Sequence, residues 1–157
     1  REHGDDRVVL RQRGTALLAA GRHKEAVRDF ERVLKKAPRD VLVLNNLATL
    51  LGPTNPDRAL LMARRARDLL PRDGAVADTL GWLLLKAGEH ERALELLRDA
   101  NKLAGGVPEL RYHLGAALHA MGRLADARAE LEGALAHKGD FAGRSDAQAL
   151  LLKLRAN

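Results

Sequence analysis

Apolar residues recur along the chain with helical spacing, and the same arrangement occurs four times. In one such unit, Ala77, Leu80 and Leu84 share a helix face at spacings of three and four residues, and a second stripe begins at Ala93. Between the two stripes, the stretch KAGEH contains Gly88, which can adopt a left-handed backbone at a helix end. The pattern predicts a helix, a short turn and a second helix in each unit.

Two independent sets of landmarks share one period. An alanine opens the second stripe of each unit with gaps of 33, 34 and 34 residues, at Ala26, Ala59, Ala93 and Ala127. A small residue in the first stripe recurs with gaps of 34, 33 and 34 residues, at Gly14, Ala48, Gly81 and Gly115. Equal periods in separate sets indicate a repeated supersecondary unit.

This period divides the chain into six expected segments. They are an N-terminal extension at 1–6, four repeats at 7–40, 41–73, 74–107 and 108–141, and a C-terminal capping helix at 142–157. The capping helix is predicted from an apolar stripe at Ala147, Leu150, Leu151 and Leu154. Ser145 and Gln148 have the spacing of a capping box. The chain does not begin with Met, and we expect it to be a piece of a longer protein.

The second repeat has its own boundary signals. It is one residue shorter than the others, and GPTNP replaces the usual glycine turn. We expect the preceding helix to end near Leu51, with Asn55 as the N-cap of the next helix and Pro56 in its first turn. Asp40, after Pro38, is expected to cap the first helix of this repeat.

These landmarks resemble the tetratricopeptide repeat, whose pattern has leucine–glycine, a large residue, an alanine, another large residue and a proline. The third repeat matches this pattern at Leu80, Gly81, Leu84, Ala93 and Leu97. The resemblance covers residues 7–141 and implies an all-α, right-handed superhelix of four helix-turn-helix repeats plus a capping helix. Arg13 stands where the first repeat should have a leucine, which suits a terminal repeat.

The resemblance also implies a concave groove lined by the first helix of each repeat. Successive residues of a helix are rotated by about 100° around its axis. We therefore assign to the groove eight residues that this rotation places away from the packed face of the first helices. They are Arg11, Thr15, Asn45, Thr49, Asp78, Trp82, Tyr112 and His119. Asp78 would repel a terminal carboxylate, which disfavours the carboxylate grip of some family members. Two interpretations of Trp82 remain open: an anchor for a peptide side chain or sugar ring, or sideways packing between neighbouring first helices.

The composition narrows the chemistry. The chain has no cysteine, so a disulfide, a thiolate nucleophile and a cysteine zinc site are excluded. Its single serine, Ser145, lies in no nucleophile or phosphate-loop motif. His113 and His119 do not share a helix face as a zinc pair would. We therefore expect a protein that is not an enzyme, with no catalytic residue, no metal and no cofactor.

The charge leaves several partners open. The net charge is +6, with 20 arginines and 7 lysines. Such a balance is typical of proteins that bind nucleic acid or anionic polymers. The alternative explanation is a GC-rich genome, which equally accounts for the excess of arginine over lysine together with abundant alanine and leucine. The densest basic run, ARRARD at 63–68, is expected on a charged outer helix surface. No aromatic platform for bases accompanies it, so RNA is the least favoured partner.

A narrower resemblance concerns four stretches, beginning at VLNNLATLLG, DTLGWLLLKAGE, PELRYHLGAALHAMGR and DAQALLLKL. They are similar to the C-terminal repeats of bacterial tetratricopeptide-repeat proteins that accompany exopolysaccharide export, such as exosortase-associated lipoproteins. This implies a periplasmic or outer-membrane-associated location, although the residues themselves suit the cytoplasm equally. The expected function is a scaffold that binds a partner protein or peptide in the groove, with an acidic polysaccharide as the alternative ligand.

Overall fold

The computed structural model describes residues 2–156, with side chains from residue 6 onward. This range contains nine helices and no strand, so the expected all-α fold is confirmed. The helices are α1 (Glu2–Ala19), α2 (His23–Lys36), α3 (Val41–Leu51), α4 (Pro56–Leu69), α5 (Gly74–Lys86), α6 (His90–Leu103), α7 (Pro108–Ala120), α8 (Leu124–Leu135) and α9 (Arg144–Ala156). None of these helices has the length and apolarity that crossing a membrane requires.

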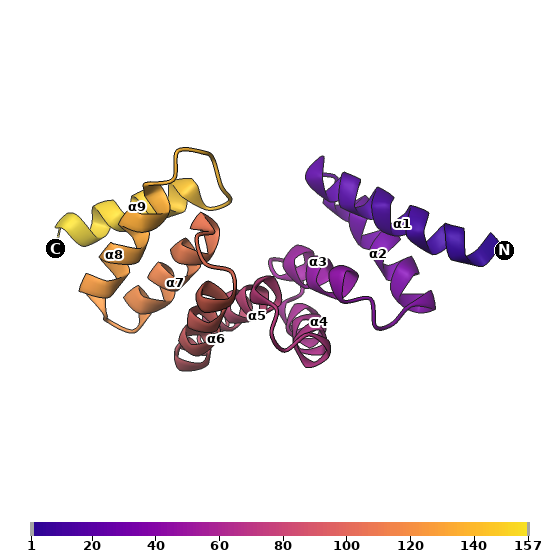
Figure 1. The fold of residues 1–157 in the computed structure, drawn as a ribbon, viewed down its shortest axis with the longest axis horizontal. Helices are drawn as coiled ribbons and strands as arrows, with labels where there is room; N and C mark the ends of the chain where they lie inside the picture. The colour runs from indigo at the N-terminus through magenta and orange to yellow at the C-terminus, as the bar shows by residue number, and fades with distance from the viewer. Residues whose placement is uncertain (1, 157) are drawn as a thin grey trace. The chain divides into compact units, whose positions relative to one another are not determined.

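The helices form two compact units, residues 1–70 (unit 1) and residues 71–157 (unit 2). Unit 1 contains the hairpins α1–α2 and α3–α4, and unit 2 contains the hairpins α5–α6 and α7–α8 followed by α9 (Figure 1). Within unit 2, α7 also packs against both α5 and α9. The residue limits of the four repeats stay a prediction, because they mark a sequence period and not a break in a helix.

The turn inside each hairpin follows from local chemistry. Gly88, between α5 and α6, has a φ of +83°, in the left-handed region where glycine carries no steric cost. The Gly88 N–H donates to the Leu85 carbonyl at 3.1 Å, and the Glu89 N–H donates to the Leu84 carbonyl at 2.9 Å. These two bonds satisfy carbonyls that the end of α5 would otherwise leave unpaired.

The recurring small residue marks where the two helices of a hairpin approach closely. A Cβ atom added to Gly81 would lie 2.8 Å from Leu97 Cγ, and one added to Gly115 would lie 3.0 Å from Leu131 Cγ. Both leucines are completely buried. A larger side chain at either glycine would push the helices apart, so the sequence period is a packing requirement.

The expected helix boundaries around the second repeat are confirmed. α3 ends at Leu51, and the Asn55 side chain accepts a hydrogen bond from the Arg58 N–H at 3.2 Å. Pro56 occupies the first position of α4. Asp40 caps α3 by accepting from the Val43 N–H at 3.3 Å. Each cap satisfies a donor that the helix itself leaves unpaired.

One of the two terminal expectations stays a prediction and the other was wrong. The segment expected as an extension outside the repeats is helical from Glu2 onward, and no proline interrupts it. An acidic side chain in it, Asp6, accepts from Lys36 Nζ on α2 at 3.0 Å. At the other end, α9 begins at Arg144, so Ser145 lies inside the helix and is not its cap. Gly143, with a φ of +84°, makes the entry into α9 instead.

The first and last repeats of this sequence differ in the contacts that their helices make. The α9 stripe packs as expected, with Ala147, Leu151 and Leu154 buried in the core that contains Leu131. In the first repeat, the Arg13 guanidinium donates two hydrogen bonds of 2.6 Å to the buried Asp29 carboxylate. These hydrogen bonds hold the pKa of Asp29 below its ordinary value. In the first repeat of this sequence, an ion pair therefore occupies the position where the other three repeats have a leucine.

Candidate functional site

Unit 2 presents an aromatic cluster, defined as Trp82 on α5 with Tyr112 and His113 on α7. The Trp82 ring stacks on the His113 imidazole, with centroids 4.0 Å apart and planes at 22°. The centroids of Trp82 and Tyr112 are 5.6 Å apart at 55°. Lys86 Nζ lies 4.4 Å from the centroid of the Trp82 ring, within cation–π range. Trp82 thus makes a sideways contact with the neighbouring first helix.

Trp82 is only half-buried, so this sideways contact uses part of its surface. The side chain of Lys86, whose Nζ lies near the ring, is itself exposed. The packing interpretation therefore describes a contact that Trp82 does make. The anchoring interpretation stays a prediction about its accessible part.

Asp78 and His113 form a buried pair beneath the tryptophan. His113 Nδ1 is 2.9 Å from both carboxylate oxygens of Asp78, and each residue is 7% exposed. Asp78 was expected on an open groove surface, and that placement was wrong because the next first helix covers it. The signal in the sequence was an acidic residue and a histidine 35 positions apart, close to one repeat period.

Tyr112 is also buried, at 7% exposure, and not open to a groove as expected. The segment between α8 and α9 covers it, since a side chain at Gly143 would collide with the Tyr112 ring. Burial raises the pKa of the Tyr112 hydroxyl above its ordinary value, with a smaller contribution from the Asp146 carboxylate. Sequence periodicity could not show this cover, because it comes from an irregular segment.

Glu109 is a further charged residue near the aromatic cluster, and it interacts electrostatically with His113 and Asp78. It lies one turn before His113 on α7 and is partly buried. Burial raises the pKa of its carboxyl, His113 opposes that shift, and Asp78 adds to it. His119, in the last turn of α7, is half-buried and takes no part in the ring contacts of the cluster.

The four predicted site residues of unit 1 lie on its first helices. The Thr15 hydroxyl donates to the Arg11 carbonyl at 3.0 Å, and the Thr49 hydroxyl donates to the Asn45 carbonyl at 3.2 Å. Both threonines are exposed, and their hydroxyls can still accept. Asn45 is half-buried, and its Oδ1 has no hydrogen-bond partner among the described residues.

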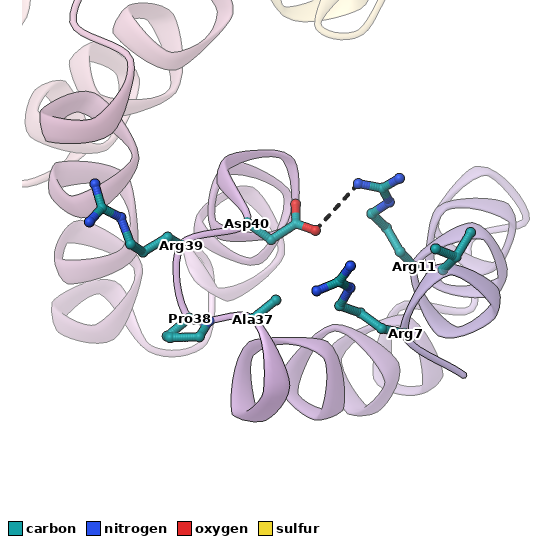
Figure 2. A pocket seen from close by; sticks show the side chains of 7 residues that line it. Arg7, Arg11, Ala37, Pro38, Arg39 and Asp40 are labelled. Atoms are coloured by element: carbon teal, nitrogen blue, oxygen red, sulfur yellow. Dashed lines mark hydrogen bonds and ion pairs between the residues drawn. The ribbon is translucent and has the colours of Figure 1, made fainter. Parts of the chain in front are cut away.

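Unit 1 also has a pocket that sequence reasoning missed, the arginine pocket (Figure 2). It has a volume of about 350 Å³ and lies between α1 and the segment that joins α2 to α3. Its lining consists of Arg7, Val8, Arg11, Ala37, Pro38, Arg39 and Asp40. Arg11 Nη1 is 3.4 Å from Asp40 Oδ2 across the pocket. Of the predicted groove residues, Arg11 alone lines it.

The positive charge of the chain is unevenly divided. Residues 1–70 carry 15 of the 27 Lys and Arg and 9 of the 21 Asp and Glu, whereas residues 71–157 carry 12 of each kind. The whole excess of six positive charges therefore belongs to unit 1. The basic run at 63–68 is partly engaged internally, since Arg65 donates to the Pro38 carbonyl at 2.7 Å.

The described residues do not assemble a recognisable set of reactive groups. No group of three His, Cys, Asp or Glu in the described part of the chain could hold a metal ion. The Asp78–His113 pair resembles the supporting half of a nucleophilic triad. The chain has no cysteine, however, and its single serine, Ser145, lies in α9. The surfaces that the structure describes present an aromatic cluster in unit 2 and guanidinium groups in unit 1.

Comparison with known proteins gives consistent results. Family models described as tetratricopeptide repeat match residues 84–154 and residues 7–50. A structure of MamA labelled MSR-1 has a TM-score of 0.71 and 26% identity, covering 96% of this chain and 87% of that one. MamA from Desulfovibrio magneticus RS-1 has a TM-score of 0.71 and 18% identity, covering 97% of this chain and 92% of that one.

An enzyme also contains a similar region. A mutant O-GlcNAc transferase from Thermobaculum terrenum has a TM-score of 0.78 and 25% identity over 85% of this chain. The matched region is 26% of the transferase chain, so the likeness concerns one part of that enzyme. No curated protein matches the sequence significantly.

Proposed function

The chain belongs to the tetratricopeptide-repeat family, and on that premise we propose that it is a non-catalytic scaffold that binds a partner protein or peptide. The binding surface is the face of the first helices, α1, α3, α5 and α7, where the family resemblance implies a groove. The observation that carries the proposal is Trp82, an aromatic residue held in a fixed orientation on a first helix and still partly accessible.

Trp82 is suited to anchor a peptide because its orientation is already fixed. Stacking on His113 holds the ring from one side, and the Asp78 carboxylate holds His113. A side chain that is ordered before binding loses little conformational entropy when the ligand arrives. Partly buried tryptophans of this kind often contribute more binding energy than their neighbours.

The eight predicted site residues take two roles in this proposal. Six are accessible in whole or in part and contact the ligand: Arg11, Thr15, Asn45, Thr49, Trp82 and His119. Asp78 and Tyr112 are buried and position Trp82 from below through the aromatic cluster. A loss of Asp78 or Tyr112 would therefore act through the orientation of the tryptophan.

A peptide selection with an optical readout tests the proposal. A random peptide library displayed on phage is selected against the chain, and the selected peptides are titrated while the emission of Trp82, the only tryptophan, is recorded. Because the ligand would contact the ring, we expect a saturable shift or quenching of that emission. Peptides that bind tightly without changing Trp82 emission would overturn the assignment of Trp82.

Lys86 and Lys102 provide a matched pair of variants. Both are exposed and lie in the last turn of a helix, Lys86 on the first helix α5 and Lys102 on the second helix α6. We expect Lys86→Glu to change the affinity of the selected peptides several-fold and Lys102→Glu to leave it unchanged. Equal effects of the two substitutions would place the ligand elsewhere.

A narrower form of the proposal places the scaffold in a bacterial envelope assembly that exports polysaccharide. Its only support is the resemblance of the four stretches to repeats of export-associated proteins. Fractionation of the source bacterium tests it: the natural protein is expected in the periplasmic or outer-membrane fraction. Recovery of the natural protein in the cytoplasmic fraction would contradict this location.

The alternative ligand is an anionic polysaccharide, with RNA less favoured. The excess charge of unit 1 supports it, since six uncompensated positive charges attract a polyanion. Retention on immobilised alginate, together with binding of a uridine oligonucleotide, would be measured against salt concentration. Polymer binding that is observed only at low salt, and that is weakened equally by substitution of any basic residue, would indicate general charge attraction and not a specific site.

A further inference from the structure

We propose that the arginine pocket of unit 1 binds a carboxylate side chain from an acidic segment of the partner peptide. This inference rests on the proposed function and adds the chemistry of the peptide. The pocket carries two carboxylate-binding side chains: Arg7, which has no hydrogen bond or ion pair with the side chains that the structure describes, and Arg11, which is only weakly paired.

Arg7 and Arg11 act on the pocket together. They lie one turn apart on α1, so they occupy the same face of the helix. In Figure 2, both guanidinium groups extend from α1 toward the segment Ala37–Asp40, whereas Arg39 leaves that segment on its other side. Two like charges at this spacing repel one another, and an anion between them removes that cost.

The internal carboxylate does not neutralise both arginines. Asp40 Oδ2 is 3.4 Å from Arg11 Nη1, longer than the roughly 2.7–2.9 Å of a strong charge-assisted hydrogen bond. The other oxygen of Asp40 already accepts from the Val43 N–H. Among the described residues, Arg7 has no hydrogen bond or ion pair. One further carboxylate would therefore complete the pocket.

The shape of the pocket favours an amino-acid side chain. Its volume of about 350 Å³ is large enough for one or two amino-acid side chains. Val8, Ala37 and Pro38 supply apolar wall for the methylene groups of a glutamate or aspartate. The planar guanidinium donors match a carboxylate in a two-point arrangement.

The surroundings of the pocket disfavour nucleic acid. Single-stranded nucleic acids are bound by positive grooves together with aromatic side chains on which the bases stack. Phe30 is the sole aromatic residue in residues 1–70, and it is completely buried.

Fluorescence anisotropy with a defined peptide tests the inference. The probe is a fluorescein-labelled peptide of alternating glutamate and glycine, and its glutamine counterpart is the negative control. We expect the glutamate peptide to bind and the glutamine peptide not to bind. Arg7→Gln and Arg11→Gln should each weaken binding about tenfold, because each removes a charge-assisted hydrogen bond. Arg28→Gln removes an exposed arginine of α2 in the same unit and should change binding less than twofold.

A gain-of-binding variant separates the pocket from general charge. Asp40→Asn removes the competing carboxylate while keeping a side chain that caps α3 well. We expect it to tighten binding of the glutamate peptide several-fold. Asp57→Asn makes the same change in net charge on an exposed residue of the first turn of α4 and should have no such effect.

Several results would overturn the inference. Equal weakening by Arg7→Gln and Arg28→Gln, or equal tightening by Asp40→Asn and Asp57→Asn, would show attraction by overall charge. Tighter binding of a uridine oligonucleotide with the same dependence on Arg7 and Arg11 would assign the pocket to RNA. If library peptides shift Trp82 emission while Arg7→Gln and Arg11→Gln have no effect on any peptide, the pocket assignment fails and the scaffold function stands. If no library peptide binds at all, the scaffold function itself fails.

Discussion

Units 1 and 2 are built from the same helical hairpin, yet they present different chemistry. Unit 1 carries the entire net charge of +6, and its sole aromatic residue, Phe30, is buried in the core. Unit 2 has as many acidic as basic residues and places Trp82 on a first helix, stacked on His113. The comparison shows that the repeat landmarks determine the hairpin, while the residues between the landmarks determine what its surface can bind.

The packing that the two units share gives the largest expected effect. Phe30 in α2 fills the space beside Gly14, and Leu131 in α8 fills the space beside Gly115. We expect Phe30→Ala to reduce the free energy of unfolding by about 3–5 kcal/mol and Leu131→Ala by about 2–5 kcal/mol, since each leaves a cavity. Urea denaturation followed by far-UV circular dichroism measures both. A loss below about 1 kcal/mol at one site would show that the two hairpins are not packed alike.

The buried Asp78–His113 pair of unit 2 gives the next effect. His113→Ala leaves the Asp78 carboxylate buried without its partner, and we expect a loss of about 3 kcal/mol in the free energy of unfolding. Asp78→Asn should cost less, because an asparagine can still hydrogen-bond to His113. Urea titrations followed by Trp82 emission measure both losses. Strictly additive effects in the double variant would argue against direct coupling of the two side chains.

The dependence of stability on acid pH tests an ion pair that belongs to unit 1. The pKa of Asp29 is below its ordinary value of 3.8 in the folded chain, so its ion pair with Arg13 contributes stability above that value. This contribution is lost as pH falls through the lower, folded-state pKa. We expect Asp29→Asn to reduce stability at neutral pH and to flatten the fall in thermal midpoint below pH 3.8. An unchanged acid profile in the variant would contradict the role of this ion pair.

Alkaline titration reports on unit 2 and should show the smallest effect. The pKa of Tyr112 is raised by burial above its ordinary value of 10.0, so the folded chain favours the protonated hydroxyl. The corresponding stability is present below pH 10.0 and is lost as pH rises through the folded-state pKa. Thermal midpoints above pH 10 should fall less in Tyr112→Phe than in the parent chain. Identical alkaline profiles would indicate that the hydroxyl is solvated.

Local signals made the fold predictable from the sequence. The end of α3 at Leu51, the cap at Asn55 and the left-handed Gly88 each depend on a few neighbouring residues. The close approach at Gly81 was visible because a small residue recurred with the period. Features of this kind can be predicted from short stretches of sequence, because they depend on residues that are close together in the chain.

The candidate site was less predictable because it depends on contacts between distant segments. The rotation of 100° per residue identified the face of Trp82 but ignored the next first helix, which buries Asp78 against His113. The arginine pocket lies between α1 and the segment that joins α2 to α3. The two residues in contact across it, Arg11 and Asp40, are 29 positions apart in the sequence. No periodic pattern in the sequence brings these residues together, so the structure was needed to find the pocket.

Chemical-shift mapping by nuclear magnetic resonance tests the central claim most directly. A library-selected peptide is titrated into the isotope-labelled chain, and the amide and Trp82 indole shifts are followed. We expect the largest shifts to lie on the first helices α1, α3, α5 and α7 and to include the Trp82 indole N–H. Shifts confined to the second helices α2, α4, α6 and α8, with the indole unmoved, would contradict it.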